Sequence, residues 1–116
     1  MRVSRLIIEM LTFWHPHLLF RSYLMEFIVT DQNRRKQMIY RSNHRGIKEM
    51  DIILGRYADE HVMRMSPDEL NAFEVIMDEM DRDLLSWFTG EVKYPDHIDK
   101  VMFDKILIFT TKNARS

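Results

Sequence analysis

The apolar residues of this chain recur at steps of three and four, and this helical spacing limits the possible folds more than any other feature. The alternation of apolar and polar residues that marks a half-buried strand does not appear. The 116 residues include only three glycines and three prolines, too few for the many tight turns of an all-β protein. We therefore predict an all-α fold, a small compact bundle of five short helices.

The first two predicted helices flank a turn at residues 43–46. Asp31 is the expected N-cap of the first helix. Met38 and Ile39 of this helix should face inward, and its basic run, residues 34–36, should stay in water. The second helix has one apolar stripe with helical spacing, formed by Ile47, Met50, Leu54, Tyr57 and His61.

The third predicted helix has the clearest start signal in the chain. Ser66 is a suitable N-cap, Pro67 suits the first helical position, and Glu69 completes a capping box. Its inner face is expected to consist of Leu70, Phe73, Met77 and Met80.

Two further helices are expected in the C-terminal third of the chain. The fourth is short, begins with Asp81 as its N-cap and ends at Gly90. Trp87 is expected to be a core residue of this helix. The fifth follows Pro95, and its spaced residues are Ile98, Val101, Met102, Lys105, Ile106 and Phe109.

These patterns divide the chain into three parts. Residues 30–111 form the predicted helical domain, and residues 112–116 a tail that should fray. Residues 1–29 are apolar and aromatic, but their longest uncharged run, residues 10–20, is too short to span a bilayer. We interpret them as a poorly ordered extension or as the product of a start codon placed too early, with Met25 as the true start. A mitochondrial transit peptide also fits the basic beginning, although two glutamates argue against it.

Composition and charge disfavour several classes of function. The net charge of −1 predicts no strong attraction to nucleic acid or membranes. The absence of cysteine excludes disulfides, thiolate zinc sites and a cysteine nucleophile. The five histidines are scattered without ligand spacing, so we predict no metal site.

The segment of residues 41–51 carries the most chemical information. It combines arginines, a lone Gly46 and two acids. Glycine permits positive φ and close approach of another backbone, and Arg45 has a planar set of donors that suits a carboxylate or phosphate. The residue types alone are compatible with a docking surface and with an ordinary helix–turn–helix junction that has solvated charges.

The two acids of this segment, Glu49 and Asp51, lie about 200° apart around a helix. They therefore cannot both point at one small target. If both matter, one should face a partner while the other orients Arg41, Arg45 or the backbone of the turn.

The string Arg45-Gly46-x-x-Glu49-x-Asp51 resembles the signature of the succinate dehydrogenase flavinylation factors, the FAD assembly factor SdhE family. The similarity runs from about Asn33 to about Phe109 and is closer to the bacterial form, because an aspartate fills the last motif position. The first thirty or so residues have no counterpart in the family pattern. The surroundings that also match are Arg41, Ile53–Tyr57, Met65–Leu70 with Phe73-Glu74, Asp81–Leu84, Trp87, Gly90 and Pro95.

The resemblance implies a partner and a site. The partner is the flavoprotein subunit of succinate dehydrogenase, and in the family often that of fumarate reductase, to which the factor promotes covalent attachment of FAD. The FAD belongs to the partner, so the resemblance implies no stably bound cofactor, no metal and no catalytic residue in this chain. The implied partner-binding residues are Arg41, Arg45, Gly46, Glu49 and Asp51.

The resemblance also suggests a setting for the protein. It implies a monomer when free, without nucleic-acid binding or membrane insertion. The expected compartment is the bacterial cytoplasm, or the mitochondrial matrix in a eukaryote.

Three alternative functions remain open from the residues. The chain could be a generic helical adaptor that docks another protein through the same segment, without a role in flavin chemistry. It could be a small nucleic-acid-binding regulator that uses the basic residues between Arg34 and Arg45. It could also be an acid–base enzyme that uses the carboxylates between Asp78 and Asp83.

Overall fold

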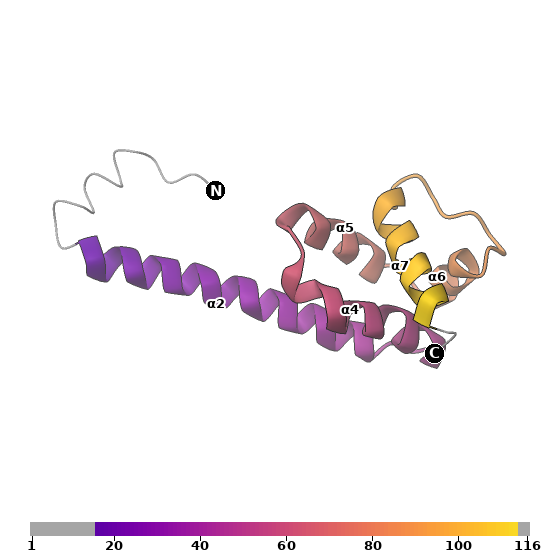
Figure 1. Ribbon diagram of the computed structural model, residues 1–116, viewed down its shortest axis with the longest axis horizontal. Helices are drawn as coiled ribbons and strands as arrows, with labels where there is room; N and C mark the ends of the chain where they lie inside the picture. The colour runs from indigo at the N-terminus through magenta and orange to yellow at the C-terminus, as the bar shows by residue number, and fades with distance from the viewer. Residues whose placement is uncertain (1–15, 114–116) are drawn as a thin grey trace. The chain divides into compact units, whose positions relative to one another are not determined.

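The structure is a computed structural model that describes residues 16–113, with side chains from residue 21 onward. No residue in this range lies in a strand, so the predicted all-α fold is confirmed. Figure 1 shows the helices in chain order. They are α2 (Pro16–Asn43), α3 (Lys48–Met50), the π-helix η1 (Asp51–Gly55), α4 (Arg56–His61), the 3₁₀-helix η2 (Val62–Arg64), α5 (Pro67–Met77), α6 (Asp81–Phe88) and α7 (Lys100–Asn113).

Helix α2 begins earlier than the sequence suggested. Asp31 lies within this helix and does not cap it, so that prediction was wrong. No glycine or proline occurs between residues 17 and 43 to stop a helix, and Pro16 suits a first helical position. The described residues contain no helix that is both long enough and apolar enough to cross a membrane.

The chain divides into two units, Met1–Arg34 and Arg35–Ser116. The second unit contains the core, which the end of α2 and the later helices share. Trp87 is buried, as predicted, and the rings of Phe88 and Phe103 stack with centroids 4.5 Å apart. The fully buried side chains of this core include Met38, Met50, Leu54, Leu70, Phe73, Ile76, Met77, Leu84, Met102 and Ile106.

Local signals set the helix ends in this unit. Ser66 Oγ accepts a hydrogen bond from the Glu69 amide at 3.2 Å, and the Glu69 carboxylate accepts one from the Ser66 amide at 3.1 Å. The predicted capping box is therefore confirmed. Gly90 follows the end of α6 with φ of +79°, a conformation that favours glycine. Met80 was expected in the core but is 70% exposed, because α5 ends at Met77 and Met80 precedes α6.

Arg35 corrects the expectation that the basic run of α2 stays in water. Its side chain is buried, and its Nη1 donates to the carbonyl oxygens of Val62 and Met65, each at 2.8 Å. Carbonyls at a helix end lack some of their intrahelical donors, so a buried arginine can satisfy them. Arg35 thereby fastens the last part of α2 to the turn before α5.

At Gly55, a second segment of the chain leaves no room for a side chain. Gly55 ends the π-helix η1 beside the last turn of α2. A Cβ atom built on Gly55 would lie 2.5 Å from Asn43 Oδ1 and 3.2 Å from the Ser42 carbonyl oxygen. Among the glycines of the described residues, only Gly90 has a positive φ, so Gly46 does not use that conformational freedom.

Candidate partner-binding site

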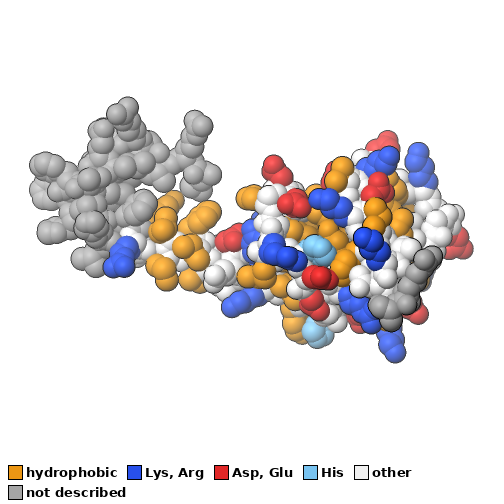
Figure 2. Space-filling model, in the orientation of Figure 1, with side chains coloured by type: hydrophobic (Ala, Val, Ile, Leu, Met, Phe, Trp, Pro, Cys, Tyr) orange, Lys and Arg blue, Asp and Glu red, His pale blue; other side chains and the backbone are white. Residues whose placement is uncertain are grey.

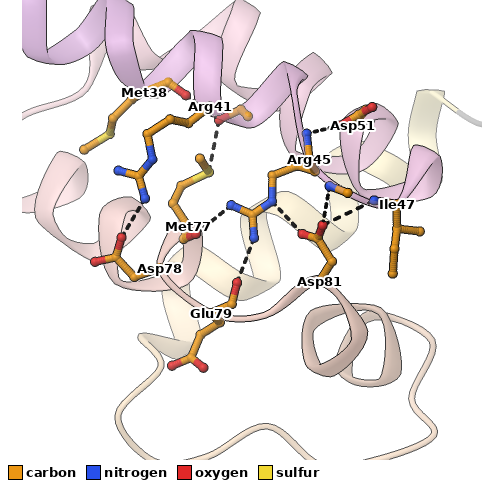
Figure 3. Close-up of polar contacts among 11 residues, drawn as sticks. Met38, Arg41, Arg45, Ile47, Asp51, Met77, Asp78, Glu79 and Asp81 are labelled. Carbon is orange, nitrogen blue, oxygen red and sulfur yellow. Dashed lines mark hydrogen bonds and ion pairs between the residues drawn. The ribbon is translucent and has the colours of Figure 1, made fainter.

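The motif begins in the loop of residues 44–47 between α2 and α3, and carboxylates hold this loop from within the chain (Figure 3). The Arg45 amide donates to Asp51 Oδ1. The Gly46 and Ile47 amides both donate to Asp81 Oδ2, at 2.6 and 3.3 Å. Three successive amides are thus bound, and the loop has a fixed backbone conformation.

The guanidinium of Arg45 points into the chain. Its Nε donates to Asp81 Oδ1 at 2.6 Å, and its Nη1 and Nη2 donate to the carbonyl oxygens of Met77 at 2.6 Å and Glu79 at 2.7 Å. Only 11% of the side chain is exposed. The carboxylate that binds the Arg45 guanidinium is therefore that of Asp81. Together with its bonds to the Met77 and Glu79 carbonyls, this contact stabilises the connection between α5 and α6.

Asp81 was predicted to be the N-cap of α6, and that prediction was wrong. It lies in the first turn of α6, where the helix dipole favours a carboxylate. It is not the N-cap, because that position belongs to Met80. Its two oxygens instead bind the Arg45 side chain and the amides of Gly46 and Ile47. Two successive backbone amides and one guanidinium therefore donate to a single carboxylate of the same chain.

The two acids of the motif have different environments, as their positions around a helix predicted. Asp51 binds the backbone of the turn through the Arg45 amide. Glu49 lies in the first turn of α3 and is exposed. Within the described residues, Glu49 forms no hydrogen bond or ion pair, so its carboxylate is available to another molecule.

Gly46 is exposed, but its position is still restricted. A Cβ atom at Gly46 would lie 3.3 Å from Asp81 Oδ2, which is tighter than an ordinary contact. A larger residue would therefore push on the carboxylate that holds the loop. The absence of a side chain at Gly46 therefore leaves room for Asp81 to hold the loop, and Gly46 is also part of the exposed surface.

Arg41 precedes the motif in the last turn of α2. Its Nη2 lies 2.7 Å from Asp78 Oδ1, with side-chain exposures of 43% and 62% (Figure 3). An exposed ion pair of this kind contributes little stability. The neighbouring rings of Tyr40 and His44 stack with centroids 3.9 Å apart. This end of α2 therefore adds a cation and an aromatic pair to the exposed surface beside the motif.

The carboxylates between Asp78 and Asp83, which we considered as a possible acid–base site, include three that form ion pairs or hydrogen bonds within the chain. Asp78 pairs with Arg41 and Asp81 with Arg45, while Glu79 Oε1 lies 2.5 Å from His97 Nε2. Within residues 21–113, whose side chains the structure describes, no group of three or more His, Asp or Glu side chains is placed to hold a metal ion.

The basic residues between Arg34 and Arg45, on which the nucleic-acid hypothesis depends, do not all face solvent. Arg35 and Arg45 are buried or nearly so and bind carbonyl groups of the chain. A nucleic-acid surface needs cations that reach solvent together. The arrangement in this structure does not favour that hypothesis.

The fold and the site together define a small helical protein whose charged loop between α2 and α3 is held by hydrogen bonds within the chain. Residues 36–110 match the family described as flavinator of succinate dehydrogenase. Because this match covers more than half of the sequence, the chain belongs to that family. The resemblance inferred from the motif is confirmed.

Curated relatives support the same assignment. The chain is 31% identical over 97 residues to "Succinate dehydrogenase assembly factor 2, mitochondrial" of Schizosaccharomyces japonicus, covering 75% of this chain and 68% of the relative. The protein of that name from Lodderomyces elongisporus is 36% identical over 83 residues, covering 72% of this chain and 51% of the relative. The Saccharomyces cerevisiae protein is 32% identical over 74 residues, covering 64% and 46%. The chain thus spans about half to two thirds of these relatives.

Proposed function

We propose that this chain binds the flavoprotein subunit of succinate dehydrogenase and promotes the covalent attachment of FAD to it. Family membership supports the link to succinate dehydrogenase. The observation that carries the proposal is the contrast within the motif: Arg45 and Asp51 fix the loop, while Glu49 is left exposed. A preformed loop loses little conformational entropy when it binds, which favours a transient but specific contact.

The role of this chain would be to hold the partner in a productive geometry. Fixing reacting groups in place can remove much of a barrier without any catalytic group from the helper. The proposal therefore assigns no catalytic residue to this chain and leaves FAD with the partner subunit. We also propose the flavoprotein subunit of fumarate reductase as a second partner, because members of this family often assist FAD attachment to that subunit as well.

The proposal places the protein where the flavoprotein subunit matures. That compartment is the cytoplasm in a bacterium and the mitochondrial matrix in a eukaryote. The names of the relatives include the word mitochondrial, whereas Asp51 at the end of the motif is typical of the bacterial form.

The main experiment is co-expression of the flavoprotein subunit with and without this chain. Covalent flavin is scored by in-gel fluorescence after denaturation, and binding by co-purification of the subunit. We expect fluorescence to rise when the chain is present. Equal fluorescence in both samples would contradict the proposal, and co-purification without a rise in fluorescence would identify a generic adaptor.

Glu49→Ala tests the exposed surface of the motif. Because Glu49 has no partner within the described residues, the change should leave thermal unfolding unchanged and weaken binding of the subunit roughly tenfold, the order expected for loss of a charged contact. Lys48→Ala, at the next exposed position, is the matched control and should have a smaller effect. The reverse order of the two variants would show that another face binds. Gly46 is a less clean probe, since any side chain there also disturbs Asp81.

A further inference from the structure

A groove of about 560 Å³ lies away from the motif, between α4 and α7. Elements other than the motif loop form it, namely α4, η2, the start of α5 and α7 from Lys105 onward. Figure 2 shows one face of the second unit, on which hydrophobic side chains and a histidine lie among Lys, Arg, Asp and Glu side chains. The lining of the groove includes aromatic rings (Tyr57, His61 and Phe109), cations (Arg64, Lys105 and Lys112), Ile108 and Glu69.

The floor of the groove is a rigid aromatic cluster. The rings of Tyr57 and His61 stack with centroids 4.2 Å apart. The ring of Phe109 meets both edge-on, at 5.4 Å from Tyr57 and 5.1 Å from His61. Burial, followed by the charge of Glu69, raises the pKa of Tyr57, so its phenol stays neutral at ordinary pH. Ile108 is 58% exposed at the edge of this floor and offers further apolar area.

The rim of the groove is positively charged. Arg64, Lys105 and Lys112 line it against a single carboxylate, that of Glu69. Lys105 Nζ lies 3.5 Å from Glu69 Oε2, a pair that is about half exposed and therefore weak. The chain as a whole has a net charge of −1. This local excess of cations over an apolar floor is therefore a feature of the groove and not of the whole surface.

We propose that this groove is a second docking site, which accepts an acidic segment of a protein partner that inserts one large apolar side chain. The apolar side chain would cover the aromatic floor and Ile108, while carboxylates on either side would meet the lysines and the arginine. The charge complementarity between a cationic rim and an acidic segment selects this occupant. The inference does not depend on the function proposed for the motif.

The test uses the full chain and a fluorescein-labelled pentapeptide in which four glutamates surround one phenylalanine. Two comparison peptides replace the glutamates by glutamines or the phenylalanine by glycine. Fluorescence anisotropy should show binding of the first peptide at least about tenfold tighter than either comparison at low salt, and weaker binding at high salt. Equal binding of all three peptides would overturn the proposal.

Matched variants locate the binding on α7. Lys112→Glu should weaken the acidic peptide roughly fivefold, whereas Lys100→Glu, the same charge change at the other end of α7, should not. Ile108→Ser should weaken it a few-fold through lost apolar contact, whereas Val101→Ser, which is equally exposed at 61%, should not. Equal effects of variant and control would show that the peptide responds to overall charge and would overturn the proposal. Glu49→Ala should leave peptide binding unchanged, which separates this site from the motif.

Discussion

At the scale of single residues, the motif combines residues with different tasks. Arg45 and Asp81 are 36 positions apart in the chain and bind each other with little exposure to solvent. Asp51 acts on the backbone of the same loop. Glu49 makes no such contact and faces solvent. A short signature can therefore contain residues that fix the backbone of a loop as well as residues whose side chains are exposed on its surface.

Arg45→Lys tests the structural task. Lysine keeps the charge but cannot reproduce the planar set of three hydrogen bonds to Asp81, Met77 and Glu79. We expect a loss of about 1–3 kcal/mol in the free energy of unfolding, because nearly buried carbonyls lose their donors. Urea unfolding measures this loss. Arg56→Lys, at an exposed position of α4, is the control and should stay within about 0.5 kcal/mol of the unchanged protein. Equal stabilities of the two variants would show that the Arg45 contacts contribute little.

At the scale of elements, two kinds of contact decide how the helices end and meet. The capping box at Ser66 and the positive φ of Gly90 act within a few residues of their own helices. Gly55 and Arg35 act across the chain, where η1 and η2 contact the last part of α2. The π-helix η1 begins at Asp51, the last residue of the motif. It shifts the helical register by part of a turn while keeping Met50, Leu54 and Tyr57 buried.

Gly55→Ala should destabilise the contact between α2 and η1. The added Cβ would lie 2.5 Å from Asn43 Oδ1, so Asn43 would have to move and would lose its hydrogen bond to Asp59, now 2.9 Å long. Overpacking of this kind costs about 1–3 kcal/mol, which thermal or urea unfolding would detect.

The cause of that loss can be separated by a double variant. If the side chain of Asn43 causes the strain, Asn43→Ala combined with Gly55→Ala should cost less than the sum of the two single changes. Purely additive losses would place the strain at the Ser42 carbonyl, 3.2 Å away.

The start of α5 should make stability depend on acid pH. Hydrogen bonds from the backbone and side chain of Ser66, aided by Lys105, lower the pKa of Glu69. A lowered pKa in the folded state stabilises the protein above the unfolded pKa, about 4.3, and this contribution is lost as pH falls through the folded pKa. Glu69→Gln should therefore lose less stability than the unchanged protein between about pH 5 and pH 3. Urea unfolding across this range measures the difference, with Glu60→Gln on the exposed side of α4 as control. Parallel pH profiles for all three proteins would contradict the assignment.

At the scale of the whole molecule, the second unit contains the core, the motif and the groove, and it begins at Arg35. The family match begins at the next residue. The predicted boundary at residue 30 lies nearby but remains a prediction, as do the extension and the tail. Residues 1–15 and 114–116, which include parts of both, lie outside the described range.

A chain that starts at Met25 should retain the full stability of the second unit. Its urea unfolding should stay cooperative, with a free energy within about 0.5 kcal/mol of the complete chain. A chain that starts at Met38 is the contrasting variant, because it lacks Arg35 and leaves the Val62 and Met65 carbonyls without that donor. It should lose about 1–3 kcal/mol or more. Loss of cooperative unfolding in the Met25 variant would show that the second unit depends on residues before Met25 for its stability.

The sequence by itself determined the fold class, the family and the ends of several helices. Helical periodicity, the Ser66 capping box and the terminating Gly90 are local signals, since each depends on residues within a few positions of one another. They hold in the structure for that reason. The different environments of Glu49 and Asp51 were also predictable, because residues two apart lie on different sides of a helix.

Only the tertiary structure decided what the charged residues of the site do. The burial of Arg35, the binding of Arg45 to Asp81 and the closeness of Gly55 to Asn43 all join residues that are distant in sequence. Residue type shows that an arginine can bind a carboxylate or a carbonyl, but it does not show which of these groups lies close to a given arginine. That choice depends on how the helices pack, and in this structure it directs the Arg45 guanidinium to Asp81, Met77 and Glu79.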